Sequence, residues 1–591
     1  MSEKNHGVSF GPLPLIIGIT GHRNLRPEDV PALETKVRNE FSAIRSRYPY
    51  TPLVLLSPLA EGADRLVARV GLQMGITLHV PLPMPRAIYV TDFNEAAMAE
   101  FVQLEQQAEQ VLELPLVRGN SAESVQRPGD ARNHQYDAVG EHIAKHSQIL
   151  FALWDGQPAT KKGGTADIVQ WRLTELPAAS ATLLHAPDPV LSGPVVQIVT
   201  PRQGHPMPAE PFSVVKHFPK ALQHSAVPEE TFSEIFAQID AFNHEVVQKA
   251  NPAGLQQSRT YLFPDEKALQ LSTVMRRTRD CFASADLLSG NNQRQSFISF
   301  KWILAFVFAS VVIYEIFEQV LSMFAYAMLS YPTLLSLAYS VYYWAKWQDY
   351  QNKYQDYRAL AEGLRVQFFW RLAGHNDSVE SHYLRKHRAE LNWIRTALRV
   401  HWALNGGEYS CPCGNSTQPD DRMSWVLQHW IDDQLGFFQR RAESETHKHE
   451  QLERKIKFGL GIGIAMSVSF GVLFVTLYNN VHHVEEWFHH NRWAEGILIV
   501  LTSLPLLTGM VIHAFVQYRA LEQQARQYKV MAKLLGAARS LWQSMTLSSA
   551  GEPSTRSLRE LVNELGKEAL MENADWVMLH RDRPLEVPHG K

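Results

Sequence analysis

The chain has 591 residues, which is too long for a single hydrophobic core, so several domains are expected. Its 57 lysines and arginines nearly balance its 60 aspartates and glutamates, which leaves a formal net charge of −3. This balance excludes a global attraction to nucleic acid, and no nucleic-acid partner is expected. Three cysteines, Cys281, Cys411 and Cys413, are too few for a disulfide framework and indicate a reducing compartment.

The first third of the chain alternates short apolar runs with stretches of helical spacing. Strands are predicted at residues 14–20, 52–57, 76–82, 148–154, 181–186 and 195–201, and helices at 27–48, 61–75, 94–112 and 133–146. Near-continuous apolar strands separated by helices are typical of a parallel sheet covered on both faces. We therefore expect an α/β, Rossmann-like cytoplasmic domain over residues 1–205.

The composition changes after a proline-rich passage at 201–211. The predicted divisions are a helical connector at 206–290, a first two-transmembrane unit with its cytoplasmic helix at 291–375, a cytoplasmic helical section at 376–450, a second two-transmembrane unit at 451–548 and a helical tail at 549–591. The later part is thus expected to be an all-α transmembrane domain with long cytoplasmic helical extensions.

Four apolar segments approach the ~20 residues that a spanning helix requires. They lie at 297–314, 320–345, 458–478 and 496–515. The alternative is two buried hairpins of a large soluble core. Lysines and arginines flank the outer ends of each pair and are scarce in the dividers, so the positive-inside bias places both termini in the cytoplasm. A multi-pass protein of the inner membrane is expected.

The two pairs of spans resemble a repeat, because each continues as an amphipathic helix. The apolar stripes of these extensions consist of Tyr357, Leu360, Leu364 and Phe368, and of Tyr528, Met531 and Leu535. Such extensions pack on one another or on another subunit, which favours a homo-oligomer. Small residues at 459–471 favour a close helix–helix contact over a pore lining.

Three cytoplasmic loops are expected to converge, because ligands of open parallel sheets bind outside the carboxyl ends of the strands. The loops follow the predicted strands at 14–20, 52–57 and 148–154. Their candidate ligand-binding residues are Gly21, His22, Arg23, Ser57, Glu61, Gly62, Asp64, Arg65, Asp155, Gly156, Gly163, Gly164 and Thr165.

The residue types in these loops suit a phosphorylated ligand. Glycines let the backbone approach an anion, and the first N–H groups of a helix stabilise it. Arg23 can pair with a phosphate, while Glu61 or Asp155 can accept hydrogen bonds from ribose hydroxyls. None of the loops is a Walker loop or a dinucleotide fingerprint, and any one alone is typical of a tight strand-to-helix turn.

The stretch LLSPLAEGADRLVA at 55–68 resembles the glycine-containing motif of the DNA-processing protein A and lysine-decarboxylase-like Rossmannoid families. GITGHR at 18–23, VPLPMPRAIYVTDF at 80–93 and the segments HSQILFALWDG and GGTADIV extend the likeness over roughly residues 10–200, in the order of a SLOG domain. SLOG domains also occur in bacterial relatives of the cytoplasmic region of TRPM channels. The resemblance implies binding of a nucleotide or nucleotide-derived signal.

Three later stretches, YRALAEGLRVQFFW, HYLRKHRAELNWIRTALR and WIDDQLGFFQRRAE, resemble SLATT modules. These two-span effectors accompany SLOG or nucleotide-cyclase sensors in bacterial conflict systems. The two resemblances together imply a membrane effector of an antiphage defence system. Its SLOG-like domain would bind a nucleotide-derived signal and gate an oligomeric transmembrane region, which permeabilises the inner membrane.

Two alternatives remain at this point: a membrane-anchored nucleotide or NAD N-glycosidase, and a constitutive channel or scaffold with a degenerate sensor. The loop KKGGTAD lacks the third glycine of the related cytokinin-activating enzymes, and Asp167 stands near their acidic position. This departure argues against N-glycosidic hydrolysis, so no catalytic residue is expected. Neither a cofactor nor a metal is expected; Cys411 and Cys413 supply fewer ligands than a structural zinc site requires.

Overall fold

The computed structural model describes residues 12–158, 163–174, 193–219, 228–264, 271–319, 329–375, 377–383, 391–404, 419–480, 491–547 and 555–583. The chain forms two compact units. The sheet unit contains Met1–Ser284 and Leu360–Thr417, and the helical unit contains Ala285–Ala359 and Gln418–Lys591. Both units are therefore discontinuous in sequence. The divisions fall inside α11 (Thr273–Gln319) and α13 (Tyr350–Leu372), two long helices.

The sheet unit is built on a seven-stranded, mostly parallel sheet in the order β4-β3-β2-β1-β5-β6-β7. Its strands are β1 (Leu15–Gly21), β2 (Leu53–Leu56), β3 (Thr77–Leu82), β4 (Gln110–Glu113), β5 (Ile149–Trp154), β6 (Val195–Val199) and β7 (Val214–His217). Only β7 is antiparallel to its neighbour. The central strands are buried along nearly their whole length, as their continuous apolar sequences require.

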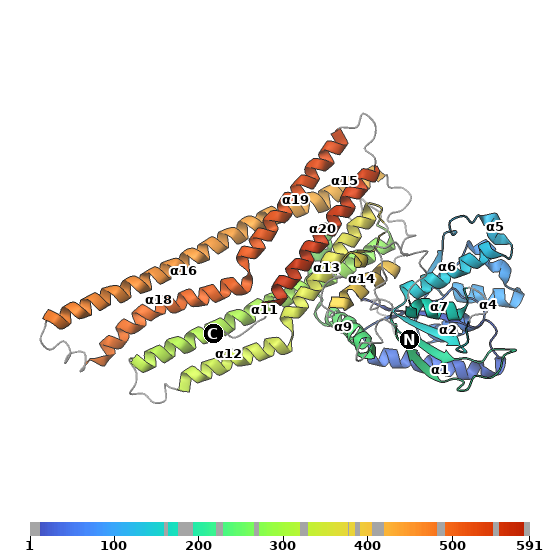
Figure 1. The fold of residues 1–591 in the computed structure, drawn as a ribbon, viewed down its shortest axis with the longest axis horizontal. Coiled ribbons are helices and arrows are strands. Elements are labelled where there is room, and N and C mark those ends of the chain that lie inside the picture. The colour runs from blue at the N-terminus through green and yellow to red at the C-terminus, as the bar shows by residue number, and fades with distance from the viewer. Residues whose placement is uncertain are drawn as a thin grey trace. The chain divides into compact units, whose positions relative to one another are not determined.

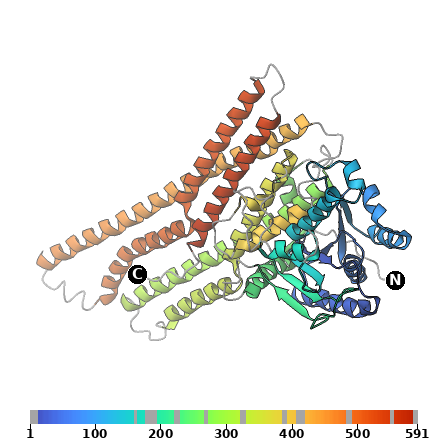
Figure 2. The ribbon, with the colours of Figure 1, turned by 45° about the vertical axis from the view of Figure 1, so that its right-hand side comes forward.

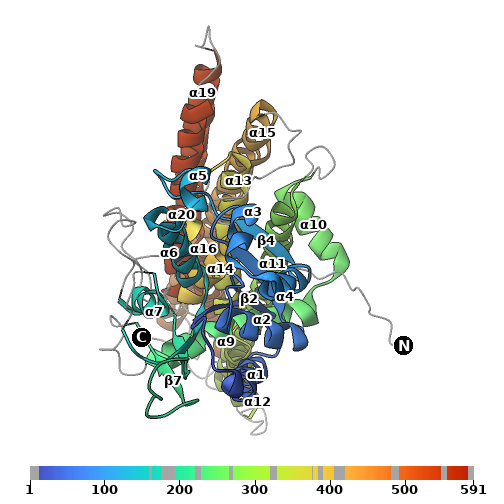
Figure 3. The same cartoon turned by 90° about the vertical axis from the view of Figure 1, so that its right-hand side faces the viewer.

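Helices cover both faces of this sheet (Figures 1 and 3). On one face, α1 (Val30–Arg47) packs with α2 (Ala63–Gln73), and the ring of Phe41 lies 5.1 Å from that of Phe151 in β5. On the other face, α6 (Asp130–His146) packs with α7 (Thr165–Thr174). There Ile143 and Ile168 join one buried cluster with Leu150.

The α/β prediction is confirmed as this mostly parallel sheet, with two errors in detail. The helix predicted at 94–112 ends at Glu105 as α4 (Glu95–Glu105), and β4 follows it. Burial alternates along β4, an edge strand whose short length gave too few periods to recognise. Strand β7 was also missed. The strand predicted at 181–186 lies outside the described residues.

Helices from distant parts of the sequence complete the sheet unit. In α9 (Pro228–Lys249), Asn243 accepts a hydrogen bond from the Leu13 N–H and donates one to the Leu13 carbonyl, both 2.8 Å long. In α14 (Asn392–Leu404), Val400 joins the buried cluster, and Trp402 lies 5.2 Å from the ring of His146. The sheet unit therefore contains a helix that follows the first predicted pair of spans.

Among the residues that the structure describes, three helical stretches are long and apolar enough to cross a membrane: Thr273–Ile316, Arg422–Leu477 and Gly496–Met545. They include the first and fourth predicted spans and all but the last residue of the third. The second predicted span begins in residues that the structure does not describe, and its described part forms α12 (Ser330–Trp347). Ser310 donates a hydrogen bond to the Tyr331 carbonyl (3.0 Å), which joins α11 to α12.

In the helical unit, α16 (Asp433–Asn480) and α18 (Arg492–Arg519) lie side by side (Figure 2). A Cβ atom on Gly459 would lie 3.1 Å from the carbonyl oxygen of Pro505, and one on Gly463 would lie 2.9 Å from Leu506. The small-residue prediction is thus confirmed for these two positions. Gly461, between them, has no such neighbour within 4 Å.

A polar and aromatic junction links α11 to the second pair of helices. Ser296 and Tyr518 share a hydrogen bond of 2.9 Å, and the Tyr518 ring lies 3.9 Å from that of Phe300. Arg519 lies over Phe297 and 3.7 Å from the buried carboxylate of Glu445. The next residue, Ala520, has a left-handed backbone (φ 48°), which separates α18 from α19 (Leu521–Leu547).

All seven residues of the predicted apolar stripes are buried. The stripe is confirmed on the second extension, whereas α13 is buried on nearly every side from Ala359 to Ala373 and shows no single apolar face. The stripe residues of the second extension lie on α19, which packs against α16 and against α20 (Thr555–Arg581). Helix α20 also contacts the start of α13, where Arg581 pairs with Asp356. The second stripe is therefore covered within this chain.

The substitution Gly463→Val should destabilise the α16–α18 pair by about 1–3 kcal/mol, because its side chain would overlap Leu506. Gly461→Val is the matched control, since a side chain there meets open space. The measurement is the unfolding midpoint of the purified chain in detergent. Equal loss in both variants would contradict the observed packing.

Candidate ligand-binding site at the carboxyl edge of the sheet

The strand order of the sheet changes direction at β1, which is its topological switch point. The chain adds β2, β3 and β4 on one side of β1 and then returns to place β5 on the other side. Crevices at such a reversal lie outside the carboxyl ends of the two strands. Here those ends are Gly21 of β1 and Trp154 of β5, so the loops at 21–23 and 155–156 meet at the reversal.

His22 and Asp155 connect these two loops. The His22 N–H donates to the Leu153 carbonyl (3.0 Å), and the Asp155 N–H donates to His22 Nε2 (3.0 Å). Burial lowers the pKa of His22, although the Asp155 carboxylate opposes this effect. A neutral ring with an unprotonated Nε2 fits the hydrogen bond from the Asp155 N–H. Asp155 Oδ1 also accepts a hydrogen bond from the Gln157 N–H (3.0 Å), so this side chain shapes its own turn.

Gly62 interlocks the second loop with the first. Its φ is +85°, and a Cβ atom there would lie 2.3 Å from the carbonyl oxygen of Arg23 and 2.5 Å from that of His22. The Ala63 N–H, at the start of α2, donates to the His22 carbonyl (3.0 Å). A Cβ atom on Gly21 would lie 2.4 Å from that of Ala63. The backbones of the two loops are therefore in direct contact, as only glycine allows.

Arg23 is an exposed cation at this edge. Its guanidinium lies 5.1 Å from the centre of the Tyr136 ring in α6. The Tyr136 hydroxyl donates to Asp92, and Asp92 also pairs with Arg132 (2.8 Å). Both burial and the Asp92 carboxylate raise the pKa of Tyr136, to about 12. Tyr136 therefore remains a neutral platform beneath Arg23.

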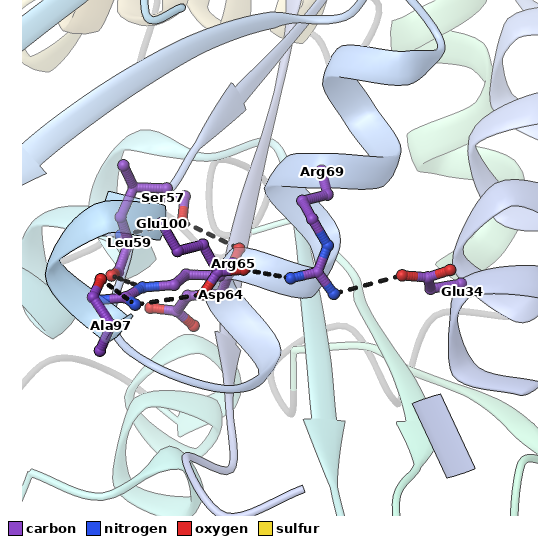
Figure 4. Close-up of polar contacts among 8 residues, drawn as sticks. All are labelled: Glu34, Ser57, Leu59, Asp64, Arg65, Arg69, Ala97 and Glu100. Atoms are coloured by element: carbon purple, nitrogen blue, oxygen red, sulfur yellow. Dashed lines mark hydrogen bonds and ion pairs between the residues drawn. The ribbon is translucent and has the colours of Figure 1, made fainter. Parts of the chain in front are cut away.

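The remaining candidates in the second loop are largely structural. Arg65 is almost fully buried and donates to the carbonyls of Leu59 (3.0 Å) and Ala97 (2.7 Å). Figure 4 shows that it also pairs with Glu100, which pairs in turn with Arg69. Ser57 accepts a hydrogen bond from the Leu59 N–H (3.2 Å). Arg65 and Ser57 thus hold the loop, whereas the partly exposed Glu61 lies on its surface.

Asp64 is buried beside these groups and has an unusual proton affinity. Burial raises the pKa of its carboxyl to about 7, against the opposing charges of Arg23 and Arg65 and a hydrogen bond from the Ala60 N–H. A carboxyl with this pKa exchanges its proton near neutral pH.

The third loop approaches the same helix as Arg23. Gly163 has φ +79°, and a Cβ atom there would overlap the carboxylate of Asp137, the residue after Tyr136. The Gly163 N–H donates to Asp167 (2.8 Å), and α7 begins two residues later at Thr165. The first N–H groups of a helix have no partner within it, so Gly164 and Thr165 bring a helix N-terminus here. Gly156 lies separately, beside Gln197.

Arg202 and His205 are functional candidates that the sequence did not reveal. Residue 202 forms a bridge with Leu25, and the Gln203 N–H donates to the Asn24 carbonyl (3.1 Å). The Arg202 guanidinium contacts His205 at 2.5 Å. The loop after β6 thus lies beside the loop after β1. In the sequence, the prolines of the loop after β6 indicated only a domain boundary. The sole sequence signal for a site was the position of this loop directly after a predicted strand.

The charges at this edge favour an anionic ligand. The carboxylates of Asp92, Asp155 and Asp167 already accept hydrogen bonds from this chain. Arg23 and Arg202, by contrast, contact neutral or titratable rings. A phosphate would receive charge-assisted hydrogen bonds from such guanidinium groups.

No model of a known protein family matches the chain, and no curated protein matches it either. Within the described ranges, no group of three or more histidine, cysteine, aspartate or glutamate residues is placed to hold a metal ion. Cys411 and Cys413 lie outside these ranges.

The substitution Gly62→Ala should destabilise the sheet unit by roughly 3 kcal/mol, because of its positive φ and its overlap with two carbonyl oxygens. Gly75→Ala is the control: its φ is +72°, but a Cβ atom there meets nothing within 4 Å. It should cost only about 1 kcal/mol. Urea unfolding of both variants compares them, and similar costs would contradict the interlock.

Proposed function

We propose that this chain is a ligand-gated membrane effector, in which a Rossmann-like sheet unit binds a nucleotide-derived anion and controls the permeability of a bilayer. The proposal rests chiefly on the exposed Arg23 guanidinium at the carboxyl edge, beside the start of α2 and near that of α7. Cationic side chains and helix N-termini together form a common phosphate-binding arrangement.

The membrane part of the proposal has four spans, both termini in the cytoplasm and a location in the inner membrane. Its support is the three apolar helical stretches, the described part of α12 and the distribution of lysine and arginine beside them. Large apolar side chains are exposed along α16, including Phe458, Val468 and Val475, which suits contact with lipid. Assembly into a homo-oligomer rests on the amphipathic helical extensions, and a role in antiphage defence rests on the SLOG and SLATT resemblances.

Gating requires that the ligand bind two arrangements of the protein with different affinities. Helices α11 and α13 each begin in one unit and end in the other, so the chain supplies two helical connections between sensor and spans. The junction of Tyr518, Arg519 and Glu445 lies at the α18–α19 corner. A rearrangement at this corner would alter the packing between the two pairs of spans.

One observation favours a second candidate, a membrane-anchored nucleotide or NAD N-glycosidase. Glu61 is a partly exposed carboxylate at the same edge as Arg23. Such a group can stabilise a departing base or orient water. Release of nicotinamide or a free base by the wild-type chain, abolished in Glu61→Gln, would favour the enzyme.

The substitution Arg23→Gln should weaken binding of a phosphorylated probe roughly tenfold, since a hydrogen bond to a charged group contributes about 1.5–3 kcal/mol. Arg45→Gln is the charge-matched control; it lies in the last turn of α1, away from the carboxyl edge. The measurement is binding of cyclic nucleotides and ADP-ribose to the full chain.

Dye release from proteoliposomes then tests gating. A ligand that binds should release dye from wild-type and Arg45→Gln vesicles and far less from Arg23→Gln vesicles. Binding without any leak would overturn the gating proposal. Equal binding to all three chains would overturn the assignment of the site.

A further inference from the structure

The acid at position 64 lies under the candidate anion site. Asp64 is the second residue of α2, and only 6% of its surface is exposed. The Ala63 N–H, one residue earlier, donates to the carbonyl of His22 (3.0 Å), and the Asp64 carboxylate interacts with the charge of the next residue of that loop, the exposed Arg23. An anion on Arg23 would therefore lie close to this buried carboxyl.

The groups around Asp64 come from four elements. Arg23 belongs to the loop after β1, and Arg65 to α2 itself. Tyr89 belongs to α3 (Arg86–Tyr89); it is buried, and its hydroxyl donates to the Pro58 carbonyl (3.1 Å). Tyr136 of α6 faces both Arg23 and Tyr89. Neither tyrosine ionises near neutral pH, because burial raises the pKa of both side chains.

Arg65 does not neutralise Asp64 completely. Its Nε and Nη1 atoms donate to two main-chain carbonyls, and Nη1 also reaches Glu100 (3.2 Å). Figure 4 shows the Arg65 side chain directed along these contacts, towards Leu59, Ala97 and Glu100. Arg23 is therefore the cation that Asp64 would share with a bound anion.

We propose that an anionic ligand on Arg23 binds together with one proton, which is taken up from solvent by the carboxylate of Asp64. This inference rests on the proposed function, since it concerns the same anion site. Ligand and proton then act as joint signals, and the affinity of the sensor depends on cytoplasmic pH.

The direction of the coupling follows from linkage. The pKa of Asp64 is about 7 with Arg23 unoccupied, and a bound anion raises it further by offsetting the guanidinium charge. Below about pH 7 the carboxyl is protonated in both states, so affinity is constant. Above about pH 7 the free protein must gain a proton to bind, so affinity falls by up to roughly tenfold for each pH unit.

The test uses ADP-ribose and sulfate, whose charges stay constant between about pH 6.5 and 9. Calorimetry of the full chain at about pH 7.5, in two buffers with different ionisation enthalpies, counts the protons taken up by the unmodified protein. Affinity is then measured across the same pH range for the wild type, Asp64→Asn and His244→Gln.

Asp64→Asn should bind with the affinity of the wild type at low pH and should keep it at high pH, because the amide stays neutral. His244→Gln removes an imidazole of α9 that stacks on Tyr50, before the start of β2 and away from the site, and should keep the wild-type slope. Proton uptake in the wild type that disappears in Asp64→Asn supports the proposal.

An unchanged pH slope in Asp64→Asn, or binding by the wild type without proton uptake, overturns the coupling while leaving the anion site intact. Absence of binding by the wild type at every pH overturns the anion site itself, and the coupling with it. Because the calorimetric measurement needs no substitution, misfolding of Asp64→Asn would not leave the question open.

Discussion

The candidate site depends on one backbone contact, between Gly62 and the carbonyl groups of His22 and Arg23. Because no side chain separates these loops, α2 begins directly against the end of β1, and the Ala63 N–H donates to the His22 carbonyl. The same contact gives Arg23 and Asp64 their opposite environments. Arg23 leaves the loop towards solvent, whereas Asp64 enters the interior with the first turn of α2.

In the helical unit, glycines likewise allow two backbones to approach closely, here those of the apolar helices α16 and α18. Gly459 and Gly463 allow α16 to meet α18, and outside this seam both helices expose apolar side chains. Polar contacts concentrate instead at the corner beside Ala520, where Glu445 and Arg519 interact. The division suits a bilayer, because close packing joins the two helices in the apolar part and charged groups occur beyond it.

Strong periodicity made much of the fold predictable. Strands β1, β2, β3, β5 and β6 are continuous or nearly continuous apolar runs, so their sequences indicate burial on both faces of the sheet. The loops that follow β1 and β2 were correctly predicted to meet, since parallel strands share a carboxyl edge. The sequence could not show that the Arg65 guanidinium donates its hydrogen bonds to main-chain carbonyls. Nor could it show that Arg202 pairs with Leu25 in a β-bridge. Both facts depend on contacts between residues distant in sequence or on side-chain direction.

The discontinuity of the sheet unit also bears on the order in which the protein is made. Val400 and Trp402 complete a core whose other residues, such as Ile143 and His146, are synthesised some 250 residues earlier. The first apolar hairpin emerges from the ribosome between them. Until α14 follows, one side of α6 lacks its cover, so the core of the sheet unit is complete only after that hairpin has been translated. Chain order thus makes the sheet unit depend on a helix that is translated after part of the helical unit.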